Sequence, residues 1–286
     1  MEIIQSFLTL NPCYTANINK ADSRYVNFQK YGPKGGMLHS VGTPQPDALV
    51  FVQNWNKPTY TRACVHAFID ANSGVVMQTL PWNFRGWHCA GTGNNTHIGV
   101  EMCETRYIKY ISGAKFEVLD RTRAVADCQR TYHSAVELFA MLAVMWNWNV
   151  DTDILSHKEG GIRGIASGHV DPEHYWSGLG MPYTMDGFRA DVKRKIEENR
   201  DMTRDETIQL IKELFPGLWD EQYDAKMQSL SGNSAGKWSK EGREWAIDNG
   251  LINGVGVLPD GSVKYAWKSP VTREQLATIL MRNDSL

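Results

Sequence analysis

The feature that most constrains the fold is a long predicted helix from about Arg121 to Trp148, whose second half, 135–148, is apolar on nearly all sides. A helix that is apolar all round is buried, and a sheet is a suitable partner for it. Short runs rich in β-branched or aromatic residues, bounded by turn formers, are predicted to be strands. They are residues 48–52, 65–69, 75–79, 97–103 and 153–156. These patterns predict an α/β protein with a mixed central β-sheet flanked by helices.

A second helix is predicted over residues 186–199, where Phe188, Val192 and Ile196 recur every four residues on one face. Asn72-Ser73-Gly74 separates two strand candidates and predicts a hairpin turn. Because domains usually hold about 100–200 residues, a chain of 286 residues suggests one large and one small domain. We expect the large domain to span 1–198.

Composition excludes some classes of partner. The formal net charge is −2 and no basic stripe stands out, so nucleic acid is not the expected partner. No stretch approaches the ~20 apolar residues of a membrane span. The N-terminal Met1–Leu8 has no basic region and only a short apolar run, so a signal peptide is not expected. The 5 cysteines show no CxxC, which favours free thiols in a reducing compartment.

Three segments of the large domain carry residues suited to chemistry. They are Met37-Leu38-His39-Ser40; Gly86-Trp87-His88 followed by residues 94–101; and Ser156-His157 leading to Gly168-His169-Val170-Asp171-Pro172. Zinc prefers imidazole, thiolate and carboxylate ligands, and a catalytic site leaves one position open. His39, His157 and Asp171 would supply three such ligands. There is no HExxH motif, so spacing alone leaves the metal site an open question.

Together these segments resemble the type-2 N-acetylmuramoyl-L-alanine amidases, the superfamily of phage lysozyme-like amidases and peptidoglycan recognition proteins. The resemblance runs from about residue 36 to 196 and is nearest to prophage endolysins. It is carried by Leu38-His39, Gly86-Trp87-His88, Ile98-Gly99-Val100-Glu101, and Ser156-His157 with Asp171-Pro172. It implies a peptidoglycan recognition protein-like fold. It also implies zinc-dependent hydrolysis of the amide between the lactyl group of N-acetylmuramic acid and L-alanine.

The resemblance also implies a role for each matching residue. His39, His157 and Asp171 would bind zinc, and Glu101 would help to activate the attacking water. His169 stands where many relatives carry a Lys that stabilises the oxyanion, and the alternative that His169 replaces His157 as a ligand stays open. The expected substrate contacts are His66, Trp87, His88, Asn94 and Asn95. For these five, packing, a turn or a structural hydrogen bond is the alternative.

The C-terminal part has a different character. We expect a helical segment and linker over 199–237 and a small helical module over 238–286, with a turn at Asp260-Gly261. Residues 238–246, 249–254 and 271–276 resemble an S-layer homology motif, which implies binding to a secondary cell-wall polymer. A copy of ~45 residues has little core of its own, so pairing of two chains in a homodimer is a further hypothesis.

The sequence is also compatible with two other functions. A superfamily member that lacks a third ligand would only bind peptidoglycan, and a metallopeptidase would cut within the stem peptide. For the amidase, the expected setting is phage-induced lysis. The enzyme would then wait in the host cytoplasm until a membrane pore lets it reach the wall.

Overall fold

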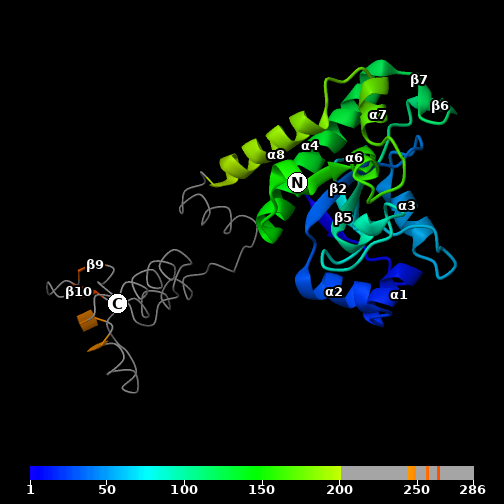
Figure 1. Cartoon of the computed structure of the whole chain (residues 1–286). Helices are drawn as coiled ribbons and strands as arrows, with labels where there is room; N and C mark the ends of the chain where they lie inside the picture. The colour runs from blue at the N-terminus through cyan, green and yellow to red at the C-terminus, as the bar shows by residue number, and fades with distance from the viewer. Residues whose placement is uncertain (201–243, 246, 249–255, 258–262, 265–286) are drawn as a thin grey trace, which may run out of the picture. The chain divides into compact units, whose positions relative to one another are not determined.

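The computed structural model describes residues 1–200 and, beyond them, residues 244–245, 247–248, 256–257 and 263–264 (Figure 1). The chain divides into two compact units, Met1–Asp201 and Met202–Leu286. The candidate site lies entirely in the first unit.

A six-stranded sheet forms the centre of this unit, in the order β1-β4-β3-β5-β2-β8. The strands are β1 (Ile3–Gln5), β2 (Gly35–Ser40), β3 (Ala67–Ile69), β4 (Val76–Gln78), β5 (His97–Met102) and β8 (Ile154–Ser156). All neighbours pair in parallel except β3 and β4, which are antiparallel. This confirms the predicted mixed sheet.

The helices of the first unit lie around this sheet. They are α1 (Pro12–Ile18), α2 (Ser23–Tyr31), α3 (Ala48–Trp55), α4 (Arg121–Trp146), α5 (Val150–Asp153), α6 (His157–Ile162), α7 (Glu173–Gly178) and α8 (Met185–Arg200), with a 3-10 turn, η1, over Thr92–Asn95. α4 and α8 lie side by side, as Figure 1 shows. The arrangement of a central sheet flanked by helices is as predicted.

The two long predicted helices are present nearly as expected. α4 ends at Trp146, and Asn147 follows with a left-handed backbone (φ 54°). Its apolar half packs on one face of the sheet, where Phe139 shares a core with Leu38 and Val100. α8 adds Phe188 to the same core. The burial expected of the 135–148 segment therefore holds for most of 135–143, which lies between the sheet and α8, whereas Val144 and Met145 are exposed.

The expected strand at residues 48–52 is wrong, because this segment is the first part of α3. The side chain of Asp47 accepts a hydrogen bond from the Leu49 N–H and caps the helix. Phe51 and Trp55, one helical turn apart, both contact the ring of Phe68, each at 4.9 Å between ring centroids. A five-residue apolar run is too short for its period to distinguish strand from helix.

The central strand β2 was not predicted, because its sequence opens with two glycines. A Cβ at Gly36 would lie 2.7 Å from Phe139 Cε1, and one at Gly35 would lie 2.2 Å from the Asp153 carbonyl oxygen. These contacts explain the glycines: neighbouring groups approach the strand too closely for a side chain.

Two hairpins complete the first unit. β3 and β4 flank the predicted turn at residues 72–74, where Gly74 has φ +78°. β6 (Ile108–Ser112) and β7 (Lys115–Val118) form a separate two-stranded sheet that was not predicted.

The described part of the second unit is small. Residues 244–245 and 247–248 are helical and lie within the small helical module expected over 238–286. β9 (Gly256–Val257) pairs antiparallel with β10 (Val263–Lys264). The turn expected at Asp260-Gly261 lies outside the described residues. The other helices expected after residue 200, and most of the S-layer-homology-like segments, lie outside the described residues. Among the residues described, no helix has the length and apolarity needed to cross a membrane.

Candidate metal centre

The candidate site forms where three parallel strands end side by side. In the register of β2 and β5, His39 lies opposite Glu101, and Leu38 of β2 lies opposite Ser156 of β8, directly before His157. Side chains alternate between the faces of a strand. Leu38 and Val100 face α4, so His39 and Glu101 face the opposite side. The carboxyl ends of parallel strands are a usual place for a site in α/β sheets.

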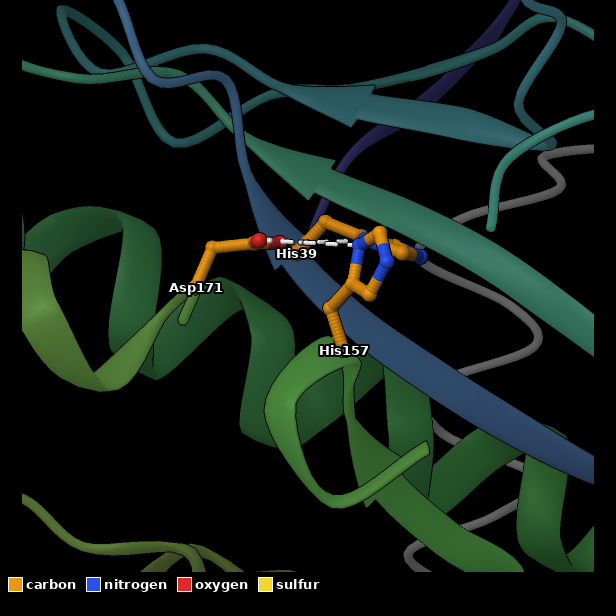
Figure 2. Close-up of side chains that lie close together, drawn as sticks. All are labelled: His39, His157 and Asp171. Carbon is orange, nitrogen blue, oxygen red and sulfur yellow. Dashed lines mark hydrogen bonds and ion pairs between the residues drawn. The ribbon is translucent and has the colours of Figure 1, made fainter. Parts of the chain in front are cut away.

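His39, His157 and Asp171 converge at this edge, although they are far apart in the sequence (Figure 2). The Nδ1 of His39 lies 3.0 Å from the Nδ1 of His157 and 3.1 Å from the Oδ2 of Asp171. The Nδ1 of His157 is 3.5 Å from the Oδ1 of Asp171. All three residues are buried.

Each of the three side chains is positioned by a separate element. β2 is paired on both sides and carries His39. His157 is the first residue of α6, which begins with a capping box between Ser156 and Glu159. Asp171 precedes α7 and joins Pro172 by a cis peptide bond, and its carbonyl accepts a hydrogen bond from the Lys158 N–H.

The donor set fits a zinc ion. In a tetrahedral site with Zn–N and Zn–O bonds of about 2.0–2.2 Å, neighbouring ligand atoms lie roughly 3.4 Å apart. The distances of 3.0, 3.1 and 3.5 Å bracket that value. Two imidazoles and one carboxylate are also a usual protein ligand set for catalytic zinc, with the fourth position left for water or substrate.

The electrostatic states of His39 and Asp171 suit a cation. Burial lowers the pKa of His39, so this ring is neutral near pH 7. Burial would raise the pKa of Asp171, but hydrogen bonds with His157 and His39 outweigh it and hold that pKa below its ordinary value. A neutral imidazole and an ionised carboxylate are the forms that bind metal.

Glu101 lies beside this group and is protonated more readily than an ordinary glutamate. Burial raises its pKa well above the usual value, and the charges of Asp171 and Glu104 raise it further. Its Oε2 is buried and has no hydrogen-bond partner among the described residues. A carboxyl group with a raised pKa is suited to exchanging a proton near neutral pH.

His169 lies at the rim of the group. Its side chain is 68% exposed and its Nδ1 is 4.0 Å from the Oδ1 of Asp171. Its ring is 4.6 Å from that of His157 between centroids. Of the two histidines considered for the second ligand position, the structure therefore brings His157 into contact with His39.

The five expected substrate contacts occupy different environments. His66 is fully buried, and both of its ring nitrogens bond to the backbone, at the Phe84 carbonyl and the Gly99 N–H. Burial lowers its pKa to about 4. Because no ring nitrogen is left for a ligand, we exclude His66 from the proposed contacts.

Asn94 and His88 also face inward. The Oδ1 of Asn94 accepts hydrogen bonds from the backbone N–H groups of His88 and Cys89, so this side chain shapes the loop. The Nδ1 of His88 lies 3.0 Å from the Nε2 of His39. Burial, and then the neighbouring His39 and His66, lower the pKa of His88 well below its usual value.

Trp87 and Asn95 are half-buried. The Trp87 indole N–H donates to the Tyr25 hydroxyl at 3.0 Å, and the Asn95 Oδ1 accepts from the Arg85 Nε at 2.7 Å. Their partially exposed surfaces keep them available as contacts for a ligand.

Sequence reasoning missed a buried polar network next to the site. Glu104 has no exposed surface, and burial raises its pKa to about 7. Its Oε2 accepts a hydrogen bond from the Tyr110 hydroxyl at 2.7 Å, and that hydroxyl lies 2.8 Å from the Nε2 of His174. The only sequence signal for this network is the position of Glu104 just after a predicted strand.

The fold and the site together define an α/β protein with a buried His-His-Asp centre suited to a metal ion. A family model described as N-acetylmuramoyl-L-alanine amidase matches residues 29–174, just over half of the chain. This range contains all three residues of the centre and Glu101. The chain therefore belongs to the N-acetylmuramoyl-L-alanine amidase family.

Similar proteins include the bifunctional autolysin of Staphylococcus epidermidis, 28% identical over 116 residues. The match covers 33% of this chain and only 8% of the autolysin. Among solved structures, the catalytic domain of XlyA is similar with 21% identity and a TM-score of 0.45, covering 67% of this chain and 99% of that one. The Staphylococcus aureus hydrolase AmiA in complex with its ligand has 17% identity and a TM-score of 0.46, covering 59% of this chain and 75% of AmiA.

Proposed function

We propose that this protein is a zinc-dependent N-acetylmuramoyl-L-alanine amidase that hydrolyses the bond between the lactyl group of N-acetylmuramic acid and L-alanine in peptidoglycan. The observation that carries the proposal is the convergence of His39, His157 and Asp171, with ligand atoms within 4.8 Å of one another, beside the buried carboxyl of Glu101. Membership of the amidase family supports the same reaction.

His39, His157 and Asp171 would hold the zinc ion and leave one position open toward the substrate. When bound, zinc would polarise the scissile carbonyl and lower the pKa of a coordinated water toward about 7. The anionic Asp171 would compensate part of the charge of the ion.

Glu101 would accept a proton from the attacking water and return it to the leaving amine of L-alanine. Its raised pKa suits this exchange, because a carboxyl with an ordinary pKa is a weak acid catalyst near neutral pH. His169, on the exposed rim, would donate a hydrogen bond to the oxygen of the tetrahedral intermediate. Trp87 and Asn95 would contact the substrate.

We propose that the part after residue 237 is the S-layer-homology-like module that binds a secondary cell-wall polymer, with dimer formation as an associated hypothesis. We also propose that the protein is a phage or prophage endolysin that acts at the bacterial wall. The similarity of part of the chain to an autolysin supports a wall substrate.

Digestion of purified walls tests the reaction. Mass spectrometry should find stem peptides with a free L-alanine amine and glycan with free lactyl carboxylates. A chelator should stop the release, and added zinc should restore it. Cleavage inside the stem peptide would instead identify a metallopeptidase, and wall binding without any product would identify a binding protein.

A further inference from the structure

We propose that His88 is a positioning residue that fixes the tautomer of His39, so that His39 presents an unprotonated Nδ1 to the metal. This inference rests on the proposed zinc site, and it replaces the substrate contact expected for His88. The relevant contacts run from the backbone carbonyl of His97 through the two imidazole rings to the metal centre.

The direction of these hydrogen bonds follows from the backbone carbonyl of His97, which can act only as an acceptor. The Nε2 of His88 lies 3.0 Å from the carbonyl oxygen of His97, and a carbonyl can only accept. The Nε2 of His88 therefore carries the hydrogen. A neutral imidazole has one N–H, so the Nδ1 of His88 is an acceptor.

The same reasoning then determines the tautomer of His39. Its Nε2 lies 3.0 Å from the Nδ1 of His88 and must donate to it. The Nδ1 of His39 is then left with its lone pair, and this is the atom that faces His157 and Asp171. By contrast, the Nε2 of His157 contacts the hydroxyl of Ser167 at 2.9 Å, and a hydroxyl both donates and accepts, so this contact leaves the tautomer of His157 undetermined.

The surroundings hold the His88 ring in this orientation. A Cβ at Gly99 would lie 2.3 Å from the His88 Cγ, and one at Gly86 would lie 3.2 Å from its Cδ2. The backbone N–H of His88 is also held by the Asn94 side chain at 2.8 Å. Among residues 1–200, no acidic side chain forms an ion pair with His88, which is 9% exposed. These contacts therefore favour a neutral ring in this one orientation.

Such contacts matter because the orientation and basicity of a metal-binding histidine depend on its other ring nitrogen. Loss of such a partner usually weakens metal affinity by about 10–100-fold. A residue that only contacted substrate would leave zinc affinity unchanged. Zinc affinity therefore separates the two roles of His88.

The isosteric pair His88→Asn and His88→Leu tests this role in the full chain, with zinc affinity measured by competition with a chelator. The Asn oxygen takes the place of the Nδ1 acceptor, whereas Leu offers none. We expect His88→Leu to bind zinc about 10–100-fold more weakly than the natural chain and His88→Asn to recover most of that loss. His66→Gln is the matched control: it replaces a buried histidine bonded only to the backbone, and its zinc affinity should be unchanged.

A second readout uses the metal-free protein. The NMR chemical shifts of the ring nitrogens of His39 and His88 should show that both rings carry their hydrogen on Nε2. A His39 with its hydrogen on Nδ1, or a folded His88→Leu chain that binds zinc like the natural one, would overturn the role of His88. A natural chain that binds no zinc would refute the proposed function instead, and the tautomer of His39 would still decide this inference.

Discussion

Neighbouring carboxyl groups in the site differ in protonation because their surroundings differ. Asp171 has two imidazole partners that hold its pKa below the ordinary value, whereas Glu101 has burial and two acidic neighbours that raise its pKa. Carboxyls whose pKa values are pushed apart take separate roles in many hydrolases. This difference supports the proposed roles of Asp171 as a metal ligand and of Glu101 as the group that exchanges protons.

Replacing Glu101 by Gln should separate catalysis from metal binding. The variant keeps the size of the side chain but cannot accept the proton of water, so wall hydrolysis should fall by about 10²–10⁴-fold. Zinc content should stay the same, because Glu101 is not one of the three ligands. Glu117→Gln, on the exposed β7, is the control. An unchanged rate in Glu101→Gln would exclude the proposed role.

Glu104 predicts a pH dependence of stability. Its pKa of about 7 in the folded protein lies above the ordinary value of 4.5, so the folded state holds its proton more tightly. The contribution of Glu104 to stability is therefore fully present below pH 4.5 and is lost as the pH rises through 7. This pKa difference between the folded and unfolded states corresponds to roughly 3 kcal/mol in the free energy of unfolding.

The Glu104→Gln variant checks this sign. Gln cannot ionise, so the free energy of unfolding of the variant minus that of the natural chain should increase between pH 4.5 and pH 7. Chemical denaturation of both chains in the presence of a chelator measures it. A difference that stays flat across this range would contradict the buried, protonated state of Glu104.

At the scale of elements, the site depends on where strands end and helices begin. His39 and Glu101 lie one residue before the ends of β2 and β5, and His157 begins α6. The sequence placed His157 correctly after a strand because residues 153–156 have a clear strand pattern. The sequence did not reveal β2. Its glycines are explained by close packing against residues that are distant in the sequence, and a local sequence pattern gives no information about such packing.

The cap of α6 offers an element-scale prediction. The Oγ of Ser156 accepts from the Glu159 N–H and donates to Glu173, both at 3.0 Å, and thus joins α6 to α7 on either side of the metal group. Ser156→Ala should cost about 1 kcal/mol of stability and also weaken zinc binding. Asp120→Ala removes the cap of α4 and should cost similar stability without affecting zinc. Equal zinc affinity in both variants would show that the α6 cap does not position His157.

At the scale of the whole molecule, the family resemblance indicated more about the candidate site than the strand and helix patterns did. It drew together His39, His157 and Asp171, whose proximity depends on the order β5-β2-β8 in the sheet. It also suggested His66 and His88 as substrate contacts, but both ring nitrogens of His66 bond to the backbone, and we propose a positioning role for His88. A sequence motif does not show whether a side chain faces a ligand or the interior. The Glu104 network was missed because its members come from three separate elements.

The division of the chain at residue 201 predicts separable functions. A fragment of residues 1–201 should fold, bind zinc and hydrolyse soluble wall fragments at the rate of the full chain. It should be retained less by intact walls, because it lacks the proposed wall-binding module. Sedimentation with purified walls measures retention, and equal retention of fragment and full chain would refute a binding role for residues 202–286.

The metal content of the purified full chain tests the central claim most directly. Elemental analysis should find one zinc per chain, and His39→Ala and Asp171→Ala should lose it while His66→Gln keeps it. The account is contradicted if the natural chain hydrolyses walls without bound metal, or if folded His39→Ala still retains one zinc per chain.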